Sequence, residues 1–435
     1  MQAILSLEEA PPISAPVRFF LTAPLFAIAA GALLLWSGPD LFASRWSPAA
    51  LAFTHLMTIG FMLQVMLGAL LQLLPVVAGA NMARPRLVAT LVHSTITLGA
   101  LCLVGAFLGF EPRLFQAAFF LMGAGVLTFL GAAGHALLGV PGNTPIVRGL
   151  RLALLGLFIA VGLGLWLAAS LGWALPLALV QWTNIHMGWG LAGWGTVLLA
   201  SVGFVVVPMF QQTPNYPGWF ERHFAPTTLG TVLLWSLAEG ANWTLAASLL
   251  SVGVVLLVTS FAVTTFWLQR QRKRPKLEPV QRLWQLAMLS TLAACGLWLL
   301  VRLTSLLDPW AGWPLLFGAL LLVGGFMSVM VGMLYKIVPF LVWLHLQERG
   351  QGRLKAPNMK KVLTEKSMQH QVAAHFVAFG LLLLAVWQPH WFSYPAGLAL
   401  MGANGWLLKN LLSAMAVYRR HLAQIEALEA ASTPA

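Results

Sequence analysis

Long apolar runs alternate with short polar segments along almost the whole chain of 435 residues. Most runs hold about 20 residues or more, the length that a helix needs, at ~1.5 Å rise per residue, to cross the hydrocarbon of a bilayer. Because lipid cannot hydrogen-bond an open backbone, runs this long and continuous predict helices. The pattern predicts twelve spans, at residues 17–37, 47–78, 86–110, 114–139, 149–172, 176–208, 226–243, 246–269, 281–305, 312–345, 370–388 and 392–418.

Three of these spans share a sequence pattern. The second, sixth and tenth spans are longer than a bilayer requires, are rich in glycine, and end in a short apolar stretch closed by a proline. The prolines, Pro75, Pro208 and Pro339, lie 133 and 131 residues apart. Internal repetition at a constant period indicates a repeated structural unit. The chain is therefore predicted to be an all-α polytopic membrane protein with twelve transmembrane helices in three four-helix pseudo-repeats, at residues 17–140, 148–270 and 281–418.

The distribution of Lys and Arg predicts the orientation. Basic residues gather after the even-numbered spans, as in the run at 269–276 and the segment at 349–366, whereas the loops after odd-numbered spans carry few of them. Cytoplasmic loops are the ones that carry an excess of Lys and Arg. Both termini are therefore predicted to be cytoplasmic, with an N-terminal tail at 1–16 and a C-terminal tail at 419–435.

Composition indicates the class of protein to which the chain belongs and the partners that it can bind. With 59% hydrophobic and 9% charged residues, the chain is expected in a bacterial-type inner membrane as a multi-pass protein. Its net charge of +13 is explained by membrane lipid, because the basic loops meet anionic headgroups, and nucleic acid is not expected as a partner. The two cysteines, Cys102 and Cys295, both lie in apolar runs, so the sequence indicates neither a disulfide framework nor a thiolate metal site.

Histidines inside the predicted spans are the main candidates for chemistry. His55 and His186 lie ~12 to 15 Å below the same boundary of the membrane, and 20 and 22 residues before the repeated prolines. An imidazole in hydrocarbon needs a partner, as a haem or metal ligand, a proton carrier or an interhelical hydrogen-bond donor. Glycines follow both histidines, and they serve either close helix packing or the approach of a flat macrocycle. The sequence leaves both interpretations open.

Four further residues are weaker candidates for haem ligation. His93 and His375 form a second near-equivalent pair, nearer the predicted cytoplasmic face. Met327 and Met330 lie on the tenth span at a spacing of three, and a thioether is an accepted axial ligand of haem iron. Packing is the commoner role for such methionines, because their flexible side chains fill irregular interiors.

These features together resemble the catalytic subunit I of the haem-copper oxidase superfamily, the cytochrome c oxidase subunit I-like proteins. The twelve helices in three units, the cytoplasmic termini and the histidines in helices two and six carry the resemblance. It implies that His55 is a ligand of a low-spin haem and that His186 is a ligand of the copper at the oxygen site. More broadly, the chain is similar to NnrS-type membrane haem proteins of nitric oxide metabolism, through its twelve helices and the His followed by Gly-Phe in helix two.

The chain also departs from both families. Its seventh span has no histidine where the oxidases carry an adjacent pair, its tenth span lacks their His-x-His pair, and the His-x-His-Glu start of the NnrS type is missing. Copper and full oxygen reductase activity are therefore not expected. Without the copper site, the resemblance predicts one haem b held by His55 and His186 between helices two and six. It implies an electron-transfer or nitric-oxide-related respiratory role, with a respiratory electron donor or a partner subunit; any enzyme activity would be that of an oxidoreductase.

Two other functions remain open from the sequence. One is a transporter or channel for a small solute, and the other is a cofactor-free membrane scaffold or assembly protein. A proton-coupled transporter needs a carboxylate near the midplane of the membrane, and Glu239 is the nearest approach to one. A carrier for a neutral solute needs no charge. No catalytic residue is assigned.

Overall fold

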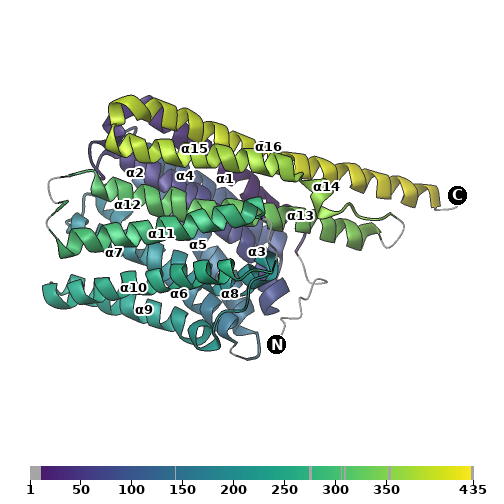
Figure 1. Ribbon diagram of the computed structural model, residues 1–435, viewed down its shortest axis with the longest axis horizontal. Coiled ribbons are helices and arrows are strands. Elements are labelled where there is room, and N and C mark those ends of the chain that lie inside the picture. The colour runs from purple at the N-terminus through teal and green to yellow at the C-terminus, as the bar shows by residue number, and fades with distance from the viewer. Residues whose placement is uncertain are drawn as a thin grey trace.

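The computed structural model describes residues 11–142, 144–273, 277–304, 306–307, 310–350 and 354–432. Over these ranges the chain forms helices and no strand. The helices run side by side along one axis, and the described chain begins and ends at the same end of the bundle (Figure 1). Parts of both predicted tails, of the basic run at 269–276 and of the segment at 349–366 lie outside the described residues.

Ten helices of the described ranges are long and apolar enough to cross a membrane. This confirms the prediction of an all-helical, multi-pass membrane protein. The ten are α1 with η2 (Ser14–Phe42), α2 to α3 (Pro48–Ala78), α4 (Pro85–Phe107), α5 (Arg113–Leu138), α6 (Pro145–Gly172), α7 to α8 (Leu179–Gln211), α10 (Thr244–Arg270), α11 (Pro279–Leu303), α12 to α13 (Trp313–Gly350) and α15 (Glu365–Trp387).

Two more long helices correspond to the predicted seventh and twelfth spans but are more polar. Helix α9 (Gly218–Gly240) opens with charged residues in its first turns, and it packs against α6 and α10. Helix α16 (Pro389–Ser432) packs along α1 and α15. A short helix, α14 (Met359–Val362), precedes α15. The bundle therefore contains twelve long helical segments in its described part, ten of them with the composition of a membrane span.

The predicted tails are partly structured. Residues 419–432 continue α16 instead of leaving the bundle, because Ile425 is buried and Glu429 pairs with Arg349 of α13 at 3.0 Å. At the other end of the chain, the carbonyl oxygen of Pro11 accepts a hydrogen bond from His345 Nε2 at 3.0 Å. The described residues of the predicted C-terminal tail, 419–432, thus form the end of α16.

Each of the three helices that share the proline pattern contains a π-helix. These are η3 (Leu56–Leu63), η4 (Trp189–Thr196) and η5 (Leu320–Met327), and their starts are 133 and 131 residues apart, as the prolines are. A π-helix is rare and is often found at functional sites. The α-helical parts around them are α2 (Pro48–His55), α3 (Gln64–Ala78), α7 (Leu179–Gly188), α8 (Val197–Gln211), α12 (Trp313–Ala319) and α13 (Ser328–Gly350).

The backbones of α6 and η4 lie closer together than they could if a side chain stood between them. A Cβ atom added at Gly156 of α6 would lie 2.1 Å from the carbonyl oxygen of Gly193 in η4. Small residues let membrane helices come together in this way, because nothing separates the two backbones. The contact fixes the position of α6 beside the helix that carries His186.

Candidate functional site

A cavity of about 1050 Å³ lies between the three helices that contain π-helices. Residues of α2, α7 and α12 line it, and these helices lie at the end of the bundle opposite the two ends of the described chain (Figure 1). Its wall is mostly apolar, and its volume is at the upper end of the range for small-molecule and cofactor sites. Residues from η3, η4 and η5 all line it, together with the polar side chains of Thr54, His55, Thr58, Thr183, Asn184 and His186.

Helix α2 places His55 at the wall of this cavity. The helix starts at Pro48, and the side chain of Ser47 caps it by accepting a hydrogen bond from the backbone N–H of Ala50 at 3.2 Å. His55 is the last residue of α2, and its Nδ1 lies 2.7 Å from the carbonyl oxygen of Leu51. Its ring stacks on Phe107 of α4 with 4.9 Å between the centroids. Because a carbonyl oxygen only accepts, Nδ1 carries the hydrogen and Nε2 keeps a free lone pair.

His186 reaches the cavity from α7 with the same protonation pattern. Its Nδ1 lies 2.9 Å from the carbonyl oxygen of Ala160 on α6, so Nδ1 again donates and Nε2 is again an acceptor. Gly164 of α6 leaves room for the ring, since a Cβ atom added there would lie 2.9 Å from Cε1 of His186. The approach of α6 to η4 therefore determines both the orientation and the tautomer of His186.

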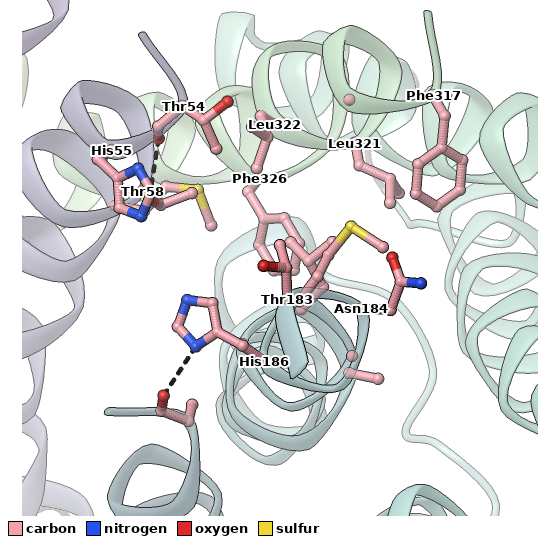
Figure 2. Close-up of a pocket in the computed structure, with 18 of the residues that line it drawn as sticks. Thr54, His55, Thr58, Thr183, Asn184, His186, Phe317, Leu321, Leu322 and Phe326 are labelled. Atoms are coloured by element: carbon pink, nitrogen blue, oxygen red, sulfur yellow. Dashed lines mark hydrogen bonds between the residues drawn. The ribbon is translucent and has the colours of Figure 1, made fainter. Parts of the chain in front are cut away.

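The two rings face each other across the cavity, each from a different helix (Figure 2). Neither Nε2 atom takes part in a hydrogen bond within the described part of the chain. The structure thus brings His55 and His186 together with two free acceptor nitrogens directed into one apolar space.

This donor set suits a haem better than a bare metal ion. A histidine that binds a metal usually donates its other ring N–H to a carbonyl or carboxylate, as both histidines do here. Among the described residues, no group of three or more His, Cys, Asp or Glu lies close enough together to hold a metal ion. A metal bound between the two imidazoles would have to bring its other ligands with it, and the pyrrole nitrogens of a haem are such ligands.

The weaker histidine candidates lie outside the cavity wall. His93 Nε2 lies 2.8 Å from Thr22 Oγ1 of α1, and His375 Nε2 lies 2.8 Å from Ser328 Oγ of α13. The Ser328 hydroxyl donates to the carbonyl oxygen of Val323, so it accepts from His375. Both histidines form hydrogen bonds between helices, the commoner role of a histidine in a membrane span.

The methionine candidates also lie outside the cavity wall. Met327 and Met330 are buried in the main hydrophobic core. Their neighbours Phe326 and Val329 line the cavity instead. The structure therefore places these thioethers in a packing position, away from the pair formed by His55 and His186.

The rim of the cavity contains polar residues that the sequence analysis did not single out as site residues. Arg45 precedes α2, donates from Nη2 to Asn184 Oδ1 at 3.2 Å, and lies over the ring of Trp46 at 4.4 Å. Burial lowers the pKa of its guanidinium from the ordinary value, although an arginine stays protonated. Arg302 lines the cavity from the end of α11 and donates to Ser248 Oγ at 2.9 Å. The sequence signal for Arg45 was its place in a loop nearly free of Lys and Arg.

Comparison of the chain with known protein families and with curated protein sequences gives no match. The function is therefore inferred from the site itself.

Proposed function

We propose that the protein is a membrane haem protein that holds one haem b between His55 and His186 and serves electron transfer or nitric oxide chemistry in a respiratory membrane. One observation carries this proposal. Two imidazoles from different helices give their Nδ1 hydrogens to backbone carbonyl groups and direct free Nε2 atoms into a single large apolar cavity.

The residues of the chain have separate parts in this proposal. A bound haem would supply an iron that gains and loses one electron. His55 and His186 hold the iron, and the carbonyl groups of Leu51 and Ala160 keep the two rings in orientation and raise their basicity. Phe107 covers one face of the His55 ring. The apolar wall keeps water away, and low polarity around a haem is one of the ways in which a protein tunes its reduction potential.

We also infer the fold of oxidase subunit I, with twelve membrane helices in three four-helix repeats and both termini in the cytoplasm. The equal intervals of the π-helices and of the prolines support this inference. Helices α9 and α16 would be the third helix of the second repeat and the fourth helix of the third. Both pack against apolar spans, α9 on α10 and α16 on α15. The missing copper ligands of the family make a haem-only site the expected form.

The test is the reduced-minus-oxidised optical spectrum and pyridine haemochrome of the purified, detergent-solubilised protein. We expect one b-type haem per chain, lost or strongly reduced in His55→Ala and in His186→Ala. His93→Ala is the matched control and is expected to keep the signal, because its ring lies outside the cavity wall. A folded protein that purifies colourless, with a blank metal analysis, would contradict the proposal and leave small-solute transport or scaffolding.

A further inference from the structure

Two arginines at the rim of the cavity lack a carboxylate partner. Arg45 and Arg302 hydrogen-bond to neutral side chains, an amide and a hydroxyl, and each guanidinium lies near a tryptophan ring. Within the described ranges, neither forms an ion pair. Glu239 lines the same rim, so the lining carries two positive charges and one negative charge. An apolar space with surplus positive charge at its rim matches an amphipathic anion.

Arg45 stands between the two helices that carry the histidines. It lies ten residues before His55, and its partner Asn184 lies two residues before His186. The hydrogen bond between Arg45 and Asn184 joins the segment that leads into α2 to α7 at the wall of the cavity. Asn184 and His186 leave opposite sides of α7 (Figure 2), so Arg45 meets a ligand in the cavity at a place apart from the histidine pair.

The chemistry of Arg45 favours a carboxylate at this point. A guanidinium has five N–H donors in a planar arrangement that fits a carboxylate, and Asn184 engages only Nη2. The ring of Trp46 holds the guanidinium plane at 4.4 Å. Because the group is half-buried, it has lost part of its hydration, and an unpaired charge in that state costs free energy. A carboxylate would offset that cost more fully than the neutral amide of Asn184.

We propose that Arg45 recognises a carboxylate of a porphyrin dicarboxylate whose apolar ring occupies the cavity. The choice of this ligand rests on the proposed haem function, where the carboxylates are the two propionates. Arg302 adds positive potential at the same rim, and Trp46 and Asn184 position the Arg45 guanidinium. Two groups of the ligand are therefore recognised. Arg45 recognises a free carboxylate at the rim, and the two histidines bind the iron.

Two ligands separate the recognition of the carboxylate from the binding of iron. Iron-free protoporphyrin IX has free acid groups but needs no histidine ligand, and its dimethyl ester has no free acid. Both are titrated by fluorescence against the full-length protein in detergent, with empty micelles as the blank. We expect the free acid to bind roughly ten to a hundred times more tightly than the ester, as one charge-assisted hydrogen-bonded pair gives. Arg45→Gln should weaken the acid about tenfold or more and leave the ester unchanged.

Two variants control for indirect effects. Arg113→Gln removes a positive charge at the start of α5, outside the cavity wall, and should leave both affinities unchanged. Asn184→Ala removes the hydrogen bond that joins α7 to Arg45 but keeps the guanidinium, so the preference for the acid should persist. Equal binding of acid and ester, or no binding of either, would overturn the role of Arg45.

The outcome for Arg45 is distinguishable from that for the haem. If His55 and His186 hold no iron, the haemochrome signal is absent while the acid preference of the iron-free porphyrin remains. If Arg45 has no role, the haemochrome signal is present and the acid preference is absent.

Discussion

At the scale of single residues, the second ring nitrogen separates two kinds of buried histidine. In His93 and His375, Nε2 is engaged by a hydroxyl of a neighbouring helix, so the ring joins helices. In His55 and His186, Nδ1 is engaged by a carbonyl oxygen and Nε2 faces the cavity. An imidazole with a free, oriented lone pair can bind a metal without first breaking a hydrogen bond. The sequence distinguishes these four residues only by their predicted depth in the membrane, whereas the hydrogen bonds show which ring nitrogens are free to bind a metal.

Ser328→Ala tests the structural role of His375. The substitution removes the only hydrogen-bond partner found for this fully buried ring, whose Nδ1 already lacks one among the described residues. We expect the free energy of unfolding to fall by about 1 to 3 kcal/mol, the cost of a buried polar group left unpaired, with the b-type spectrum unchanged. Thermal unfolding of the purified protein in detergent measures it. Thr22→Ala is the control, with a smaller loss of stability because His93 is only half-buried. Loss of the spectrum of the proposed haem in Ser328→Ala would instead connect His375 to that haem.

At the scale of elements, the π-helices and the close approach of α6 shape the cavity. A π-helix has i→i+5 hydrogen bonds, so it holds more residues per turn than the α-helix on either side of it. The three π-helices line the cavity at corresponding places. The site therefore lies where three helices change from α-helical to π-helical hydrogen bonding.

Gly156→Ala tests the contact between α6 and η4. The new methyl group would meet the backbone of Gly193, which cannot rotate away, so α6 must shift. The free energy of unfolding should fall by about 1 to 3 kcal/mol. Because Ala160 of the same helix orients His186, the spectrum or the midpoint potential of the proposed haem should change too. Redox titration and thermal unfolding measure the two effects.

Gly162→Ala is the matched control on the same helix, since nothing lies within 4 Å of the added Cβ atom. It should leave the spectrum unchanged and keep or slightly raise the stability, because alanine favours a helix more than glycine does. Equal effects of the two substitutions would contradict the role assigned to the contact.

At the scale of the whole molecule, the bundle has two unlike ends. The described chain begins and ends at one end, and α2, α7 and α12, which line the cavity, lie toward the other (Figure 1). If the basic loops are cytoplasmic, as the positive-inside rule predicts, the rim opens on the far side of the membrane. An electron donor or a small ligand would then reach the site from outside the cytoplasm.

Reporter fusions test this orientation and the number of spans. Alkaline phosphatase fused after Asn242 should be active, and the same enzyme fused after Gln212 should be inactive, because α9 lies between the two positions and would carry the chain across the membrane. A fluorescent protein at the C-terminus should fluoresce. Equal phosphatase activity at the two positions would show that α9 does not cross, and would reduce the predicted twelve spans.

The helical, multi-pass character and the positions of most spans follow from the sequence alone, because the cost of an unpaired backbone in lipid depends on the length and polarity of each local run. The sequence also revealed the period near 132 residues, and it singled out His55 and His186 by depth. It could not predict the π-helices, since a run that is apolar on every face looks the same for either helix type. Three features come from the packing of the helices: which ring nitrogens stay free, the burial of Met327 and Met330 in the core, and the contact between Arg45 and Asn184. These outcomes depend on contacts between segments that are distant in the sequence, such as the close approach of Gly156 to Gly193 and the hydrogen bonds of Arg45 and His186.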